Sequence, residues 1–524
     1  MDTFSPAKRR KIMRSVRSKN TVPERIVGRM LHSFGYPHKL QCADLPGRPD
    51  FVLSGLRVAI FVHGCFWHGH HCVNSALPKS NVPYWKAKQA RNIERDRRNL
   101  RRLHRMGWRT VVVWECQIRK NKKLKLRLSE RLNSMGHPKT KLNWYEFFAG
   151  GGMARIGLGD VWQCTLANDW CDKKGAAYKA YFGKSEELKV QDVRSIRTTD
   201  LPGTPDMVWA SFPCQDLSLA GSGAGLQGDR SGVFTPFWSL MEALIAEGRK
   251  PRLVVLENVV GAITSHEGRD FATLIRTLVR SGYRVGPLVV NAAHFLPQSR
   301  PRLFIIAISS EEDSPAGLSS TSADDVWHPP SLRRAYNRLA PTLRESWIWW
   351  RLPKPDGRLV SRLSDTIEDQ PVGVEWHSQE ETSRIISLMS ALNRKKLESA
   401  QTQGIKRIGT IYKRTRLIGE GPFKRRVQRA EVRFDEISGC LRTPVGGSSR
   451  QIILVVEGRK VRSRLLSSRE AARLMGVPED YPIPRNYNDA YHVFGDGVAV
   501  PVVAWLEKHL LRPLALRKRF EQVA

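Results

Sequence analysis

The sequence predicts an α/β protein built from two blocks. Apolar, strand-like runs alternate with helix-like stretches on both sides of a break near residue 135, and 41% of the 524 residues are apolar, enough for several hydrophobic cores. We find no internal repeat, no apolar run near the roughly 20 residues that a membrane span needs, and no apolar secretory signal at the N-terminus. We therefore expect a soluble, intracellular, multidomain protein.

The elements of the first block, residues 1–135, follow from local patterns. We expect a helix from Pro23 to Phe34, a strand pair between Pro49 and His63, and a basic helix from Tyr84 to Met106. A further strand is predicted in W-R-T-V-V-V-W-E. Residues 136–141 contain a helix-stopping Gly and Pro without apolar periodicity, so we expect a linker there.

The second block carries five apolar strand candidates between Leu142 and Ser309, and this alternation favours a parallel sheet covered by helices. They are N-W-Y-E-F-F, W-Q-C-T-L-A-N-D, D-M-V-W-A-S-F, R-L-V-V-L-E-N-V and R-L-F-I-I-A-I. We expect residues 142–309 to form one domain. Residues 310–457, mixed in pattern, should form a smaller lobe, and residues 458–524 return to helix and should complete the domain.

Charge and cysteine content restrict the class of protein. The formal net charge of +36 comes from 86 Lys and Arg against 50 Asp and Glu, and the basic residues cluster in runs such as R-D-R-R-N-L-R-R-L-H-R. Such an excess repels itself unless a polyanion neutralises it, so nucleic acid is the expected partner. Eight irregularly spaced cysteines indicate metal-binding or catalytic thiols rather than a disulfide framework.

Two stretches of the second block could bind a small molecule. The run E-F-F-A-G-G-G-M places three glycines between a strand and a helix, where the backbone can approach a cofactor. At the end of the next strand, Asp169 could accept ribose hydroxyls and Trp170 could stack on a purine. A sharp turn, an ordinary turn aspartate and a packed tryptophan are the alternative.

Cys214 is the candidate nucleophile. It follows a buried strand and Pro213 and precedes a Gly- and Ser-rich loop, at the edge where open sheets bind ligands. A free thiol has a pKa of about 8.5, so catalysis requires a polarised site. The alternative is a small buried side chain.

The ordered motifs F-P-C-Q, L-E-N-V and Q-S-R-P-R, with R-L-S-S-R-E-A-A-R-L-M-G-V-P further on, resemble those of the C5-cytosine DNA methyltransferases across residues 142–510. The resemblance implies a Rossmann-like domain that methylates carbon 5 of cytosine in duplex DNA, with S-adenosylmethionine as methyl donor. Cys214 would attack carbon 6 of a flipped cytosine. Glu257 would hydrogen-bond the ring nitrogen.

The same resemblance assigns the other site residues. Arg302, together with Arg300 and Gln298, would contact the cytosine carbonyl and hold the site together. The cofactor would contact Phe148, Gly150, Gly152, Asp169, Trp170, Asp192 and Asp496. The lobe would be a target-recognition domain, with Thr443 at the DNA. Two departures from the family are Glu146, where Asp is common, and Asp496, where Asn is usual.

The first block contains a candidate metal site and a candidate catalytic carboxylate. The run H-G-C-F-W-H-G-H-H-C offers soft ligands to zinc, with Cys116 available from a later strand. Asp50, at the start of a strand leading to His63, could hold magnesium near a phosphodiester. Solvated histidines beside packed thiols, and a simple turn aspartate, are the alternatives.

L-P-G-R-P-D-F, H-G-C-F-W-H and N-I-E-R-D-R-R resemble the very-short-patch repair (Vsr) endonucleases over residues 5–133, which nick DNA beside a T:G mismatch. The resemblance implies a restriction-endonuclease-like α/β domain. Asp50 would bind magnesium, His68 would be the general base or acid, and His63 and Glu24 would assist. The zinc ligands would be Cys65, His70, Cys72 and Cys116, and the wedge entering the base stack would be Phe66, Trp67 and Trp85.

The two resemblances suggest one bifunctional enzyme, because deamination of 5-methylcytosine produces the T:G mismatch that the first block would repair. A restriction-modification fusion that cleaves unmethylated sites, and a non-catalytic DNA-binding module, are the alternatives. We expect duplex DNA as partner, mismatch-repair proteins as further candidates, no membrane, no required oligomer, and a place in the bacterial cytoplasm at the nucleoid.

Overall fold

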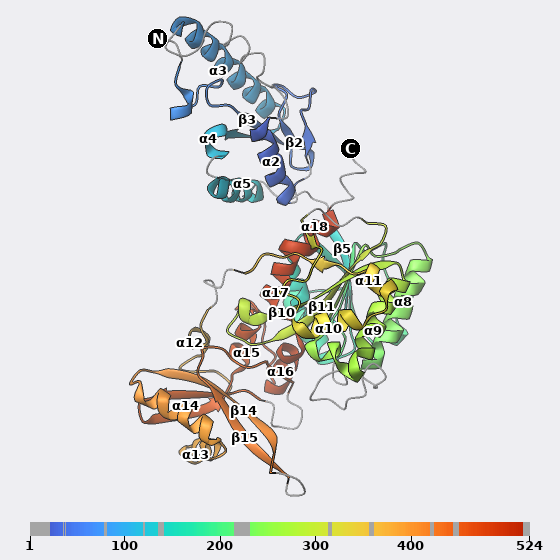
Figure 1. Ribbon diagram of the computed structural model, residues 1–524, viewed down its shortest axis with the longest axis vertical. Coiled ribbons are helices and arrows are strands. Elements are labelled where there is room, and N and C mark those ends of the chain that lie inside the picture. Colours follow the sequence, from blue (N-terminus) through green and yellow to red (C-terminus); the bar gives the residue numbers. More distant parts are fainter. Residues whose placement is uncertain are drawn as a thin grey trace. The chain divides into compact units, whose positions relative to one another are not determined.

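The computed structural model describes residues 21–34, 36, 38–77, 81–118, 121–134, 141–213, 231–312, 317–355, 361–419, 424–443 and 450–516. The chain divides into two compact units, Met1–Lys141 with Leu516–Ala524, and Leu142–Ala515 (Figure 1). Among the described residues, no helix is long and apolar enough to cross a membrane.

The first unit is a mixed four-stranded sheet, order β1-β2-β3-β4, with helices. Its elements are α2 (Val22–Ser33), β1 (Lys39–Leu40), β2 (Phe51–Leu53), β3 (Val58–His63), α3 (Val82–Arg105), β4 (Arg109–Trp114), α4 (Glu115–Ile118) and α5 (Asn121–Ser134). Helix α2 buries Val27 and Leu31, spaced one turn apart, against β2 and β3. The helices and strands that we expected in this block are confirmed, and most of their ends lie within two residues of the expected positions.

The second unit is built on a seven-stranded sheet, order β10-β11-β9-β8-β5-β6-β7. The strands are β5 (Leu142–Phe147), β6 (Trp162–Asp169), β7 (Leu188–Val190), β8 (Met207–Ala210), β9 (Leu253–Val259), β10 (Tyr283–Asn291) and β11 (Pro301–Ser309). Strands β7, β6, β5, β8 and β9 are parallel. Strand β11, expected to be parallel, is antiparallel to both neighbours, because a fully buried apolar run carries no signal of direction.

Helices cover this sheet and return to it from the C-terminal end. They are α6 (Met153–Leu158), α7 (Asp172–Phe182), α8 (Phe234–Ala246), α9 (Arg269–Arg280), α15 (Ser468–Leu474), α16 (Tyr487–Asp496), α17 (Val500–Leu506) and α18 (Arg512–Leu516). Helices α8 and α9 bury apolar side chains in the core under β8, β9 and β11. Helix α17 packs closely on α6, where a Cβ on Gly157 would lie 2.5 Å from Val503.

The lobe has its own antiparallel sheet, order β15-β14-β16-β17, and its own core. Its elements are α13 (Gln379–Ser387), α14 (Ala391–Thr402), β14 (Arg407–Ile418), β15 (Arg425–Arg433), β16 (Ile452–Glu457) and β17 (Lys460–Leu465). Strand β17 thus extends the lobe beyond the expected end at residue 457.

The start of the lobe also differs from the expected residue 310. Helices α10 (Pro330–Arg338) and α11 (Pro341–Glu345) pack Leu332 and Leu343 into the large core, and Leu339 between the two helices packs there as well. Each helix buries its apolar side in the core of the large sheet, so both helices belong to that domain and not to the lobe. The short elements β12 (Ser319–Ser320), β13 (Trp349–Trp350) and α12 (Leu363–Thr366) complete the connection.

Candidate functional site

The glycine-rich turn after β5 meets the end of β6. The N–H of Gly150 donates to Asp169 Oδ2 (2.8 Å), and the N–H of Cys171 donates to Oδ1 (2.9 Å). Phe148 takes a φ of 58°, a conformation that costs energy in a non-glycine residue. A Cβ on Gly150 would meet nothing within 4 Å, whereas one on Gly152 would lie 2.3 Å from Phe182. The turn is therefore packed on one side and open beside Gly150.

The neighbouring strand ends add two exposed groups. Trp170 is 71% exposed directly after β6. The N–H of Gln191 donates to the Asp169 carbonyl (3.0 Å), so the turn that carries Asp192 lies beside Asp169. The carboxylate of Asp192 accepts the N–H of Arg194 (2.9 Å). Open space at Gly150, an exposed indole and two carboxylates are suitable for an adenosine-containing cofactor.

Glu257, on β9, is the buried acid of the second unit. Its Oε1 lies 3.2 Å from Arg302 Nε on the adjacent strand β11. Burial raises the pKa of Glu257, and this effect exceeds the opposing effects of Arg302, Arg300 and Ser211.

The strand ends also fix the backbone that leads to the candidate nucleophile. Asn258, the residue after Glu257, donates through Nδ2 to the Phe212 carbonyl (3.2 Å). Ser211 and Phe212 follow β8 directly and come just before Cys214 in the chain. Cys214 itself lies outside the described residues, but the last described positions before it are tied to the strand that carries Glu257.

Gln298 and Arg300 are buried, with exposed fractions of 0% and 1%. Gln298 accepts the N–H of Leu441 (3.1 Å) and donates to the Leu474 carbonyl (2.5 Å). Arg300 donates to the carbonyls of Leu441 (2.9 Å), Gly495 (2.8 Å) and Gly497 (2.6 Å). These hydrogen bonds join the start of β11 to the lobe at Leu441 and to the ends of α15 and α16. The expected roles of Gln298 and Arg300 at the DNA and in holding the site together remain predictions.

Cys440 is a member of this site that sequence reasoning missed. Its Sγ lies 3.3 Å from Arg300 Nη1 and 3.8 Å from Arg302 Nη2. Burial opposes the thiolate, but the guanidinium groups of Arg300 and Arg302 outweigh it, so the pKa of Cys440 is lowered. Cys440 comes from the lobe, about 140 residues away from these arginines in the chain, and no local pattern marks it.

Thr443 lies where the lobe meets the end of α16. A Cβ on Gly495 would lie 3.0 Å from the backbone nitrogen of Thr443. Thr443 is half-buried, and the residues that follow it lie outside the described part of the chain.

The first unit gathers a second set of titratable residues. Asp50 Oδ2 accepts the N–H of Val62 (2.7 Å). Burial raises the pKa of Asp50 to about 6, and the charge of Glu24 adds to the rise. The rings of His63 and His68 stack with centroids 3.8 Å apart.

Asp96 belongs to this set and was missed as a site residue. It lies on α3, and its Oδ2 is 2.5 Å from His68 Nδ1. Ligand atoms of His63, His68 and Asp96 lie within 4.8 Å of one another. The available signal was a carboxylate inside the basic run R-D-R-R of a helix.

The four expected zinc ligands come together. One ligand atom from each lies within 4.8 Å of the others, in the set Cys65, His70, Cys72 and Cys116. The separation of Cys116 Sγ and His70 Nδ1 is 3.4 Å, close to the roughly 3.5 Å between a thiolate and an imidazole ligand on one tetrahedral zinc. Three sulfurs and one nitrogen are a donor set that zinc prefers.

The three expected wedge residues form one half-buried aromatic cluster. The ring centroid of Phe66 lies 5.0 Å from that of Trp67 and 5.5 Å from that of Trp85. Lys88 lies over both tryptophans, 5.3 Å and 5.5 Å from the ring centroids. A cation over half-buried aromatic rings is suited to a stacked, anionic ligand.

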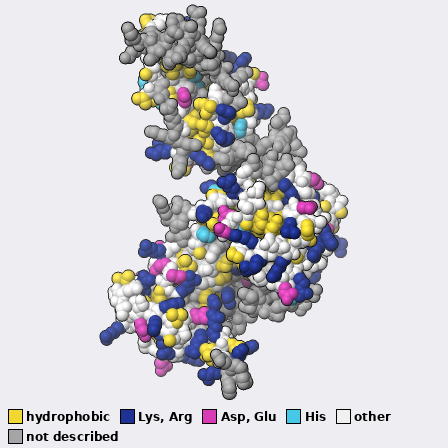
Figure 2. Space-filling view, viewed as in Figure 1, with side chains coloured by type: hydrophobic (Ala, Val, Ile, Leu, Met, Phe, Trp, Pro, Cys, Tyr) yellow, Lys and Arg dark blue, Asp and Glu magenta, His cyan; other side chains and the backbone are white. Residues whose placement is uncertain are grey.

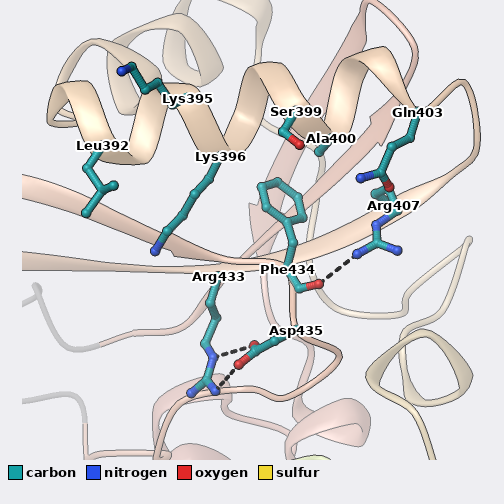
Figure 3. A pocket seen from close by; sticks show the side chains of 10 residues that line it. All are labelled: Leu392, Lys395, Lys396, Ser399, Ala400, Gln403, Arg407, Arg433, Phe434 and Asp435. Atoms are coloured by element: carbon teal, nitrogen blue, oxygen red, sulfur yellow. Dashed lines mark hydrogen bonds and ion pairs between the residues drawn. The ribbon is translucent and has the colours of Figure 1, made fainter.

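A cavity of about 460 Å³ lies in the lobe, between α14 and the ends of β14 and β15. Figure 3 shows Lys396 extending from the helix toward the strands, with Phe434, Arg407 and the Arg433–Asp435 ion pair among the other lining residues. None of the expected site residues lines it. On the face drawn in Figure 2, Lys and Arg side chains are spread over both units.

Comparisons with known proteins agree with this division. Residues 142–512 match the model of the C-5 cytosine-specific DNA methylases, and residues 1–74 match that of the DNA mismatch endonuclease Vsr. A type II nicking enzyme, V.XorIIP of Xanthomonas oryzae, is 50% identical over 117 residues, which cover 22% of this chain and 86% of that protein. The DNA mismatch endonuclease Vsr of Escherichia coli is 43% identical, covering 24% and 79%. The type II methyltransferase M.NgoBI of Neisseria gonorrhoeae is 28% identical, covering 71% and 95%.

Proposed function

Because the chain belongs to the C-5 cytosine-specific DNA methylase family, and its N-terminal part to the DNA mismatch endonuclease Vsr family, we propose that it methylates a duplex DNA site and nicks the T:G mismatches that arise there. The observation that carries the methylating half is the buried Glu257–Arg302 pair, tied through Asn258 and Phe212 to the segment that precedes Cys214. We propose the domain limits that the sequence predicts, except that the lobe begins after α11 and includes β17.

Cys214 is the proposed nucleophile, adding to carbon 6 of a cytosine flipped out of the duplex. Glu257, whose burial favours its protonated form, donates to the ring nitrogen and stabilises the enamine. Arg302 keeps that carboxyl in place and faces the cytosine carbonyl. S-adenosylmethionine supplies the methyl group. The open turn at Gly150, with Phe148, Gly152, Asp169, Trp170, Asp192 and Asp496, holds it.

The test of this half is transfer of a tritiated methyl group to duplex DNA by the full chain. Cys214→Ser should abolish transfer while binding of S-adenosylmethionine persists, because the cofactor residues are unaltered. Cys42→Ser, at a half-buried cysteine of the first unit, is the matched control and should transfer normally. Transfer that survives Cys214→Ser would refute the thiol mechanism.

For the second half, the carrying observation is the group formed by Asp50, His63, His68 and Asp96. Magnesium would stabilise negative charge at the phosphodiester. We propose that Asp50 and the Val62 carbonyl hold it and that His68, oriented by Asp96, moves the proton of the attacking water. Glu24 adds negative charge near Asp50, and His63 stacks on His68. The four-ligand Cys/His cluster holds a structural zinc.

Duplexes with a T:G mismatch inside the methylated sequence test the nicking half. Wild-type chain should nick them with magnesium, Asp50→Ala should not, and Asp50→Ala should still methylate. Fully paired, unmethylated duplexes form the second arm. Cleavage of those duplexes instead of the mismatched ones would favour the restriction-modification alternative.

A further inference from the structure

Two neighbouring lysines of α7 pair with two aspartates of α16, but in different surroundings. Lys173 Nζ lies 2.8 Å from Asp489 Oδ1, and its side chain is 69% exposed. Lys174 Nζ lies 2.6 Å from Asp496 Oδ2, and its side chain is only 16% exposed. The first is an ordinary surface ion pair, whereas the second is partly withdrawn from water.

Both charges of the Lys174–Asp496 pair are at unfavourable helix ends. Lys174 lies in the first turn of α7, and Asp496 is the last residue of α16. The helix dipole favours anions at the first turn and cations at the last. Helix stability alone therefore does not account for this pair, whereas Asp489, in the first turn of α16, has the favourable sign.

The end of α16 that carries Asp496 packs beside the glycine turn, because a Cβ on Gly497, the next residue, would lie 2.3 Å from Met153 Sδ, directly after Gly152. Burial disfavours the charge on Lys174, but Asp496 and Asp169 together outweigh it and raise the pKa of Lys174. Asp169 is the carboxylate that accepts the N–H of Gly150. Arg300 holds the carbonyls of Gly495 and Gly497, so the backbone on both sides of Asp496 is fixed.

We propose that Lys174 is a charge-balancing and positioning residue for S-adenosylmethionine, cancelling the negative charge that Asp496 brings to the site. The cofactor's amino-acid end carries a carboxylate as well as an ammonium group, and an unpaired Asp496 would repel that carboxylate. Lys174 thus makes an aspartate acceptable at a position where the resembling family usually has a neutral asparagine. This inference rests on the proposed methyl transfer, because that reaction requires the cofactor.

A double-mutant cycle with binding as readout tests it. Titration calorimetry with S-adenosylmethionine on the full chain compares wild type, Lys174→Ala, Asp496→Asn and the double variant. We expect Lys174→Ala to weaken binding by about tenfold, and the double variant to return to within about threefold of wild type, because the charge that needed cancelling is gone. Lys173→Ala is the matched control and should bind normally.

The ligand 5′-methylthioadenosine, which lacks the amino-acid end, provides the second arm. Lys174→Ala should bind it as wild type does. An equal loss for both ligands, unchanged binding of S-adenosylmethionine by Lys174→Ala, or a double variant as weak as the single one would each overturn the inference. Thermal unfolding of each variant separates a folding defect from a binding defect. If wild type itself fails to bind S-adenosylmethionine, the proposed function fails instead.

Discussion

At the scale of single residues, burial decides the protonation of the carboxyl groups. Glu257 lies in the sheet beside Arg302, and the loss of hydration raises its pKa despite that arginine. A carboxyl that keeps its proton to a higher pH can donate a hydrogen bond to a ring nitrogen.

Replacement of this acid is the first prediction. Glu257→Gln keeps the size and a donor group but cannot transfer a proton, so kcat for methyl transfer should fall by about 10²–10⁴-fold. Cofactor affinity should be unchanged because Glu257 lies outside the glycine turn. Steady-state tritium transfer and calorimetry measure the two quantities, and an unchanged kcat would remove Glu257 from the mechanism.

Glu146, on β5, gives a prediction about stability. It is fully buried, its Oε2 has no hydrogen-bond partner, and burial raises its pKa to about 8. The folded state therefore holds this proton more tightly than the unfolded chain. Its contribution favours folding below the unfolded pKa of 4.5 and is lost as the pH rises through about 8.

The measurement is the melting temperature of the second unit at pH 5.5 and pH 8.5. Glu146→Gln should gain stability relative to wild type as the pH increases, by up to a few kcal/mol, since one pKa unit corresponds to about 1.4 kcal/mol. Wild type and variant curves that remain parallel across this range would show that Glu146 does not titrate there.

At the scale of elements, the sequence correctly predicted the helices and strands that have a strong local periodicity. The apolar runs of β5, β6, β8 and β9 and the amphipathic helix α2 were predictable from spacing alone. Strand β10 was missed because Gly286 and Pro287 interrupt its apolar run, and β7 because it has three residues. The direction of β11 depends on its neighbours, which no single run encodes.

The candidate sites divide in the same way. The contact of Gly150 with Asp169 follows from strands adjacent in the chain and was predictable in outline. Asp96, Cys440 and Lys174 reach their partners through tertiary packing, across separations of 28 to 322 residues. The hydrogen bonds that Gln298 and Arg300 make to Leu441, Leu474 and Gly495 depend on the assembled domain, so no local pattern could have predicted them.

The hairpin β14–β15 supports a prediction about DNA binding. Arg414 lies directly opposite Arg429 in its register, and like charges at this spacing destabilise a sheet unless something neutralises them. Glu431 is shared by Arg414 and Arg416. A two-stranded ribbon fits the major groove of DNA, so we expect this face to bind the duplex.

The double variant Arg414→Ala/Arg429→Ala should weaken duplex binding and reduce the slope of log affinity against log salt by up to about 2. Fluorescence anisotropy at several salt concentrations measures both effects. Arg426, directly opposite Leu417, points to the other face of the ribbon by strand alternation. Arg426→Ala is the control, and an equal loss for that variant would exclude the proposed face.

At the scale of the whole molecule, the two units have separate cores, and each candidate catalytic group lies within one unit. Under the proposed function, combining the two activities in one chain would supply a repair enzyme wherever the chain methylates DNA. A lesion produced by deamination of the methylated base would then meet its nicking enzyme in fixed proportion to the methylating one.

Separate cores, together with a Cys/His cluster that belongs to the first unit, predict that the two units respond differently to zinc removal. The cluster of Cys65, His70, Cys72 and Cys116 joins the turn after β3 to α4 in the first unit, and structural zinc sites contribute directly to folding. A zinc chelator should therefore lower the melting transition of the first unit and leave that of the second unchanged. Calorimetry with and without chelator measures this, with Cys116→Ser expected to reproduce the chelator's effect and Cys164→Ser, in the second unit, expected not to. One transition that shifts as a whole would mean that the units unfold together, and two unshifted transitions would mean that the cluster holds no structural metal.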